Sequence, residues 1–290
     1  MIPEVDFLRA KSFEEALFAL SREPRTILAG GTDVFPSLKD GPLTGKILDI
    51  SGIRELKMIS NQKDVWRIGA AVTWQDLIMA DLPPAFTALK LAAAEVGSTQ
   101  IQKRATLVGN LCNASPAADG IPVLLILDAE VELMSRSSTR RIPLSSFILG
   151  NRKTAIKEGE MVSAICIPSK STSGLSSFLK LGARRYLVIS IGMIAVLINT
   201  NETGMITNIA VAIGACSEIA QRMPAVEKAL EGVPLELAPE IISGTHFTNL
   251  SPIDDLRSTS VYRRDATLLG LKKLLKSQFL LRSCDDKSRL

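Results

Sequence analysis

The chain has 290 residues, of which 46% are hydrophobic, 22% charged and 4% aromatic, with a formal net charge of +4. This composition is that of a globular protein long enough for two domains, which excludes intrinsic disorder, and the scarce aromatic side chains argue against a nucleic-acid-binding surface. The N-terminus lacks the basic and apolar regions of a secretory signal, so we expect a cytoplasmic protein.

The first fifty residues predict a small βαβ unit. Ser12, followed by Glu15, has the spacing of a capping box and begins a helix. Apolar runs at residues 26–28 and 46–50 predict strands. The first run ends in a glycine-bearing turn, which comprises Ile27, Leu28, Ala29, Gly30, Gly31, Thr32, Asp33 and Val34.

Residues 55–167 predict a second α+β region. Apolar runs at 56–60 and 65–68 favour a hairpin, and Thr73 caps a following helix. A Leu- and Ala-rich helix is expected over 84–96, and strands over 129–133 and 161–167. Between them lies a second glycine-bearing turn, which comprises Thr106, Leu107, Val108, Gly109 and Asn110.

A polar linker at 168–174 precedes the C-terminal region. There the pattern predicts a three-stranded antiparallel sheet followed by helices. The expected strands are 177–180, 189–198 and 206–213, with a hairpin turn at 201–204, and the expected helices are 225–230, 239–243 and 262–275.

The two glycine-bearing turns have the chemistry of a phosphate cradle. Glycine allows positive φ and close approach of the main chain, while N–H groups and the hydroxyls of Thr32 and Thr106 can bind anionic oxygens. Either turn alone is more typical of an ordinary tight turn. In combination, the two turns could hold one diphosphate.

The sequence offers few groups that could catalyse a reaction by themselves. His246 is the only histidine and has no acidic or thiol neighbour in sequence, which favours a surface position over a catalytic base. The four cysteines lie far apart, so we expect reduced, buried thiols and no metal site or iron–sulfur cluster on this chain. A GxGxxG fingerprint is also missing. We therefore predict no catalytic residue, and chemistry supplied by a bound group.

Three segments, 28–34, 101–119 and 153–160, closely resemble the FAD-binding subunit of molybdenum hydroxylases, the family of xanthine dehydrogenase and aerobic carbon monoxide dehydrogenase. Residues 206–235 resemble the C-terminal domain of the same subunits. The resemblance implies an α+β fold in which two subdomains hold FAD, as in vanillyl-alcohol oxidase and p-cresol methylhydroxylase. It implies an FAD-binding domain over 1–170, with subdomains of about 1–54 and 55–170, and a C-terminal domain over 175–281.

The resemblance also implies roles for individual residues. The two glycine-bearing turns would bind the diphosphate of FAD, and Asp119 the adenosine half. Val162 matches an apolar flavin contact, and Lys180 matches a lysine near the isoalloxazine. From the residues alone, Asp119 favours a binding role over capping a turn, whereas Val162 could equally be a core residue and Lys180 a solvated lysine at a strand edge.

Two positions depart from the family pattern. Val108 stands where the second turn usually has glycine. A side chain at this position changes how the main chain of the second turn approaches the cofactor. Val188 stands where an acidic residue often precedes Ile189, which affects the region near the flavin ring and the choice of electron acceptor.

By this resemblance, the chain is an FAD-dependent oxidoreductase subunit within a hetero-oligomer. A large subunit would carry molybdopterin and a small subunit two [2Fe–2S] clusters, and the FAD would pass electrons to NAD, a quinone or oxygen. Two alternatives remain open at this stage: a stand-alone FAD oxidoreductase of the same fold, and a non-catalytic assembly protein that has lost FAD.

Overall fold

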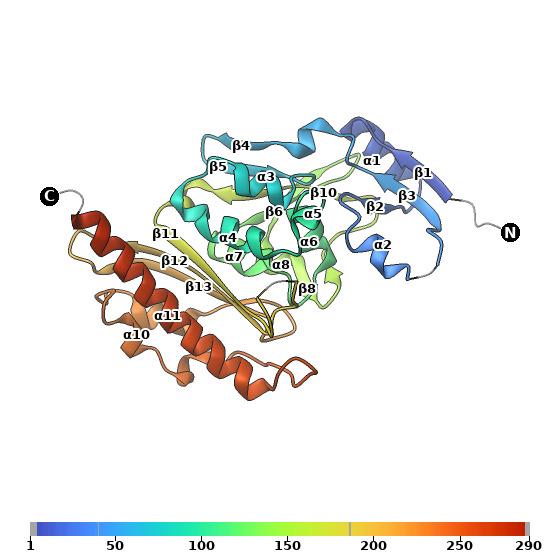
Figure 1. Ribbon diagram of the computed structural model, residues 1–290. Helices are drawn as coiled ribbons and strands as arrows, with labels where there is room; N and C mark the ends of the chain where they lie inside the picture. The colour runs from blue at the N-terminus through green and yellow to red at the C-terminus, as the bar shows by residue number, and fades with distance from the viewer. Residues whose placement is uncertain (1–4, 40, 186, 288–290) are drawn as a thin grey trace. The chain divides into compact units, whose positions relative to one another are not determined.

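The computed structural model describes residues 5–39, 41–185 and 187–287 (Figure 1). The chain divides into two compact units that are interleaved in sequence. The first unit comprises Met1–Ala80, Val96–Ala114 and Asp128–Ser169; the second comprises Asp81–Glu95, Ser115–Leu127 and Lys170–Leu290.

A parallel three-stranded sheet begins the first unit. Its strands are β1 (Val5–Arg9), β2 (Thr26–Leu28) and β3 (Gly45–Asp49), in the order β1-β3-β2, and helix α1 (Phe13–Arg22) follows β1. The Ser12 hydroxyl accepts a hydrogen bond from the Glu15 N–H (3.2 Å) and so caps α1 as predicted. Strand β1 was not predicted, because it carries Asp6 and Arg9 and is largely exposed at the edge of the sheet.

The second sheet of the first unit has five antiparallel strands, in the order β4-β5-β10-β6-β7. The predicted hairpin of β4 (Ile59–Gln62) and β5 (Val65–Gly69) is present, as are β6 (Glu130–Met134) and β10 (Met161–Pro168). Strand β7 (Thr139–Pro143) was missed because its arginines hide the alternation. The remaining elements of this unit are α2 (Val34–Ser37), η1 (Arg54–Lys57), α3 (Trp74–Met79), α5 (Thr99–Gln102), α6 (Leu107–Asn113), α8 (Leu144–Phe147), β8 (Ile148–Gly150) and β9 (Lys153–Thr154).

The second unit contains a four-stranded antiparallel sheet, where the sequence predicted three strands. The predicted strands are β11 (Leu175–Leu181), β12 (Gly192–Thr200) and β13 (Ile206–Gly214), and the unpredicted fourth is the two-residue β14 (Gln221–Arg222). Strand β12 begins three residues later than expected, because Ile189 is 53% exposed and lies outside the sheet.

Helices cover both faces of this sheet. Residues Ile194, Val196 and Ile198 of β12 join the core that includes Leu271 and Leu275. The opposite face packs against α4 and α7. The helices of the second unit are η2 (Pro84–Phe86), α4 (Thr87–Glu95), α7 (Gly120–Ile126), η3 (Ser169–Thr172, at the unit boundary), α9 (Pro224–Leu230), α10 (Ala238–Ile241), η4 (Gly244–Phe247) and α11 (Ser260–Lys287).

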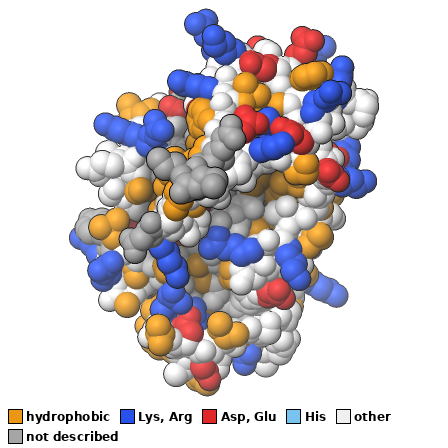
Figure 2. Space-filling view, turned by 90° about the vertical axis from the view of Figure 1, so that its right-hand side faces the viewer, with side chains coloured by type: hydrophobic (Ala, Val, Ile, Leu, Met, Phe, Trp, Pro, Cys, Tyr) orange, Lys and Arg blue, Asp and Glu red, His pale blue; other side chains and the backbone are white. Residues whose placement is uncertain are grey.

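Within the described residues, none of the helices has both the length and the apolar composition that crossing a membrane requires. On the face shown in Figure 2, Lys and Arg side chains are spread among apolar and acidic ones and do not form a single patch.

Candidate functional site

The first unit contains a pocket of about 560 Å³ that brings the two glycine-bearing segments together. Most of the predicted site residues line it, namely Ile27, Ala29, Gly30, Gly31, Thr32, Asp33, Val34, Thr106, Val108, Gly109, Asn110 and Val162. Leu28 and Leu107 are buried in the core, so only their main chain is available to this site. Segments that are about 75 residues apart in sequence therefore share one cavity wall.

The first segment presents unpaired main-chain donors. The backbone N–H groups of residues 30–34 donate no hydrogen bond to any residue that the structure describes. The carbonyls of Gly31 and Asp33, in contrast, accept bonds from Phe35 (3.1 Å) and Ser37 (3.2 Å) and so begin α2. Successive unpaired N–H groups on a pocket wall form a concavity suited to an anion.

Two glycines allow the backbone conformation and the close packing of this segment. Gly31 has a φ of +74°, a left-handed conformation that favours glycine. A Cβ on Gly30 would lie 2.0 Å from the Arg104 carbonyl oxygen. Gly30 is therefore needed for close packing of the first segment against the main chain that precedes the second. This corrects the simple interpretation that both glycines serve only to let a ligand approach.

The second segment is the beginning of a helix, which corrects its interpretation as a loop. Thr106 is the N-cap of α6, and its Oγ1 accepts a hydrogen bond from the Gly109 N–H (2.9 Å). The Thr106 oxygen thus already has a structural partner, and toward an anion the hydroxyl can act only by donating its proton. The backbone at Val108 is helical, so a β-branched residue fits there without a left-handed φ.

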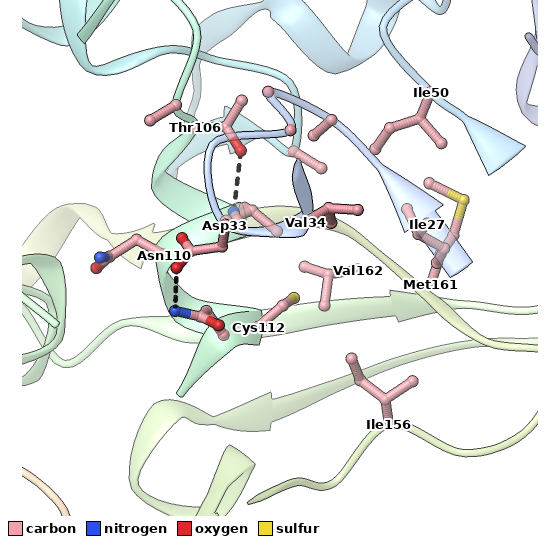
Figure 3. A pocket seen from close by; sticks show the side chains of 18 of the residues that line it. Ile27, Asp33, Val34, Ile50, Thr106, Asn110, Cys112, Ile156, Met161 and Val162 are labelled. Atoms are coloured by element: carbon pink, nitrogen blue, oxygen red, sulfur yellow. Dashed lines mark hydrogen bonds between the residues drawn. The ribbon is translucent and has the colours of Figure 1, made fainter. Parts of the chain in front are cut away.

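Apolar side chains form another part of the pocket wall (Figure 3). In that view Ile27, Ile50 and Met161 gather on one side, with Ile156 below them and Val162 near the centre, while Thr106 and Asn110 lie on the other side. A wall that is apolar on one side and rich in donors on the other is suited to a ligand with both a ring system and anionic groups.

Asp119 and Lys180 belong to the second unit, where they pair with each other. The Lys180 ammonium lies 3.0 Å from the Asp119 carboxylate and also donates to the Glu95 carbonyl (3.3 Å). Ser190 donates to the same carboxylate (3.2 Å). Burial raises the pKa of Asp119, and the ammonium and hydroxyl act against that rise. Lys180 is therefore a buried ion-pair partner and not a solvated edge lysine.

The remaining candidates have structural positions. His246 lies in η4, where its Nδ1 accepts a hydrogen bond from the Ser243 N–H (3.2 Å). Cys112, Cys166 and Cys216 are free thiols, and Cys284 lies outside the residues whose side chains are described. Cys112 lines the pocket, and burial raises its pKa to about 12, which keeps it protonated and unreactive.

Sequence reasoning missed several lining residues, including Arg25, Ile50, Trp74, Ile101 and the run Ile156–Met161. Trp74 begins a predicted helix and Ile50 ends a predicted strand, so nothing local distinguishes them from core residues. Ile101 and the residues up to Glu160 did lie in segments that carried a signal through the family resemblance, 101–119 and 153–160, but no role was assigned to them.

The protein combines helices and sheets, and its first unit has a cavity lined by apolar side chains and by main-chain N–H donors without a partner among the described residues. Residues 3–170 match the family described as FAD binding domain in molybdopterin dehydrogenase, and residues 177–278 match the CO dehydrogenase flavoprotein C-terminal domain. The chain therefore belongs to the molybdopterin dehydrogenase FAD-binding family, and its cofactor is FAD.

Relatives agree with this assignment, and solved structures share the fold. The glyceraldehyde dehydrogenase medium chain of Sulfolobus acidocaldarius is 31% identical over 94% of this chain and 98% of its own. The xanthine dehydrogenase FAD-binding subunit of Escherichia coli O157:H7 is 29% identical over 95% and 96%. In fold, a chain of CO dehydrogenase from Oligotropha carboxidovorans matches with a TM-score of 0.84, at 24% identity, over 94% and 97%.

Proposed function

We propose that the pocket of the first unit holds FAD and that this chain is the electron-output subunit of a molybdenum hydroxylase. The first-unit residues proposed to bind the cofactor are Ile27, Leu28, Ala29, Gly30, Gly31, Thr32, Asp33, Val34, Thr106, Leu107, Val108, Gly109, Asn110 and Val162. For Asp119 and Lys180, which belong to the second unit, cofactor binding is proposed from the family resemblance alone. The proposal rests above all on the unpaired N–H groups of residues 30–34 on the pocket wall.

These donors fit the diphosphate of FAD, because main-chain N–H groups bind phosphate oxygens without the desolvation cost of a buried cation. The apolar wall of Ile27, Ile50, Ile156, Met161 and Val162 fits a planar ring. When bound, FAD supplies electron transfer between [2Fe–2S] clusters of a partner and an acceptor such as NAD, a quinone or oxygen. This chain then binds the cofactor, orients it and shields it from water.

The wider assembly follows from the same proposal. We expect a molybdopterin-binding large subunit and a [2Fe–2S] small subunit as partners, and a cytoplasmic complex. We also propose the two-subdomain arrangement of the vanillyl-alcohol oxidase type for the FAD-binding domain, with boundaries at about 54 and 170, and a C-terminal domain over 175–281.

Co-purification from the native source, followed by metal analysis for Mo and Fe, tests the partners. A chain that binds FAD and purifies without either metal would favour a stand-alone oxidoreductase.

A glycine substitution tests the pocket. In Gly30→Ala the new Cβ would meet the Arg104 carbonyl at 2.0 Å, which forces the two segments apart. We expect the purified variant to lose the visible absorbance of bound flavin. Gly244→Ala is the matched control, because a Cβ there meets no atom within 4 Å, and it should retain FAD.

Thermal unfolding without FAD separates loss of the pocket from loss of the fold. A folded Gly30→Ala chain that retains full FAD affinity would contradict the site. A wild-type chain that binds no FAD after reconstitution would instead favour the assembly protein that has lost its cofactor.

A further inference from the structure

A hydrogen-bonded relay joins three separate chain segments of the first unit at the pocket. The Asn113 Nδ2 group donates to Asp33 Oδ1 (3.0 Å), and the Arg152 guanidinium donates to Asn113 Oδ1. Asp33 precedes α2, Asn113 ends α6, and Arg152 lies in the turn between β8 and β9. Asp33 and Asn113 line the pocket, whereas Arg152 is not among the lining residues.

The donor and acceptor groups of these three side chains fix the direction of the two hydrogen bonds. A guanidinium can only donate, so the Asn113 atom that faces Arg152 must be the carbonyl oxygen. The amide nitrogen must then face Asp33, whose carboxylate can only accept. Arg152 therefore determines which way the Asn113 amide points, and the two bonds strengthen each other.

The backbone at the relay is held in an uncommon conformation. Ala114 and Arg152 both have left-handed φ angles, of 46° and 59°, and the Arg152 N–H donates to the Ala114 carbonyl (2.9 Å). A residue with a Cβ has a free-energy cost in this region, and it persists only where the surroundings favour it. Glycine at position 152 would remove that cost.

Asp33 needs a partner because of its position. It belongs to the pocket-lining segment 30–34, whose N–H groups have no partner among the described residues, and its side chain does not cap α2. A carboxylate beside a bound diphosphate is repelled by it. An amide donor backed by a guanidinium holds that carboxylate in place and offsets its charge.

We propose that Arg152 is a positioning residue for the cofactor, which acts through Asn113 to hold Asp33 away from the diphosphate. This inference rests on the proposed site, because it has meaning only if residues 30–34 bind the diphosphate. It predicts that removing the guanidinium weakens FAD binding even when the protein itself becomes no less stable.

Arg152→Gly tests the inference by removing the side chain and the left-handed strain together. We expect the FAD dissociation constant, from flavin fluorescence titration of the full chain at low salt, to rise about tenfold. The melting temperature without FAD should stay the same or rise. Lys63→Gly is the matched control, since Lys63 is also an exposed basic residue at left-handed φ (51°) and lies in the β4–β5 turn, away from the pocket lining.

Two further variants distinguish positioning from structure. Arg152→Lys retains a donor for Asn113 and should restore most of the affinity. Asp33→Asn removes the negative charge that would repel the diphosphate. In that background, Arg152→Gly should therefore change the FAD dissociation constant less than threefold. Unchanged affinity in Arg152→Gly, or equal effects of that change with and without Asp33, would overturn the inference while leaving FAD binding by the wild type intact. Loss of FAD binding by the wild type would overturn the site itself.

Discussion

At the scale of single residues, buried charges in both units are paired. Glu132 on β6 accepts from Arg67 (2.9 Å), Arg141 (2.8 Å) and Ser163 (2.8 Å), and its side chain is 9% exposed. Burial by itself raises the pKa of this carboxyl, but the hydrogen bonds from Arg67, Ser163 and Arg141 outweigh it and lower the pKa to about 2. The carboxylate therefore connects its own strand β6 to β5, β7 and β10, which are four of the five strands of this sheet.

Replacing this carboxylate should make stability less dependent on pH. Because the folded-state pKa lies below the ordinary value of 4.5, the contribution is complete above about pH 4.5 and is lost as the pH falls through about 2. We expect Glu132→Gln to lower the free energy of unfolding by about 2 kcal/mol at neutral pH and by less in acid. Urea unfolding across this range measures the difference, with Glu231→Gln, an exposed position, as the control. A difference that does not change with pH would contradict the network.

Lys180→Met tests the buried pair in the second unit. Lys180 has a side chain that is 6% exposed, so its loss leaves the Asp119 carboxylate buried without a cation. We expect a loss of about 3 kcal/mol in the free energy of unfolding without FAD, part of which Asp119→Asn should recover in the double variant. If Lys180→Met weakened FAD binding and left unfolding unchanged, the ammonium would act on the cofactor and not on Asp119.

At the scale of secondary-structure elements, the first turn of α6 and the main chain before it hold part of the pocket wall in place. α6 begins at the Thr106 cap, and the main chain beside it is fixed to the α3 region by bonds from Trp74 to Ala105 (3.1 Å) and from Leu107 to Val72 (3.2 Å). The cap and these bonds set the path of the second segment. The first segment then packs against it through Gly30.

Removing the cap should weaken both the helix and cofactor binding. Thr106→Val keeps the shape of the side chain but leaves the Gly109 N–H without its acceptor, at a cost of about 1 kcal/mol in unfolding free energy. Thr106→Ser keeps the acceptor and should behave as wild type. Thr26→Val, at an exposed position of β2 with no side-chain hydrogen bond among the described residues, serves as the control. Equal effects of the Val and Ser changes would show that the hydroxyl oxygen is not the important group.

At the scale of the whole molecule, the two units have different tasks in this proposal. The pocket is built from the first unit alone, whereas Asp119, Lys180 and the four-stranded sheet belong to the second. The family assignment covers both units, because the two matches together span residues 3–170 and 177–278. FAD should therefore stabilise the chain unevenly.

Hydrogen exchange should locate that stabilisation. At FAD concentrations about a hundred times the dissociation constant, binding adds about 2.7 kcal/mol to the unfolding free energy. We expect slower amide exchange at residues 30–34, 107–113 and 156–162, and a higher melting temperature. Exchange at β12 and β13 supplies the internal reference, because this sheet lies in the second unit. The Gly30→Ala variant should show no change on adding FAD. Protection confined to β12 and β13 would place the cofactor elsewhere.

Local patterns determined much of the fold. The Ser12 and Thr73 caps, the β4–β5 hairpin and the apolar strands β10, β12 and β13 were predictable, because each depends on turn chemistry or hydrophobic periodicity within a few residues. Edge strands β1 and β7 and the short β14 were not predictable. β1 is largely exposed and pairs with β3, about forty residues further along the chain, β7 carries two arginines, and β14 has only two residues, so none of the three has a clear local pattern.

The sequence by itself also determined the family and the cofactor, because the glycine-bearing segments and their neighbours carry a specific resemblance. The tertiary structure alone decided how those segments are packed and hydrogen-bonded. It showed that Gly30 serves packing against Arg104, that the second turn is a capped helix, and that Lys180 pairs with Asp119. It also brought Arg152 to Asn113. The reason is physical: a local pattern sets backbone conformation, whereas hydrogen-bond partners, burial and pKa depend on residues that meet only after folding.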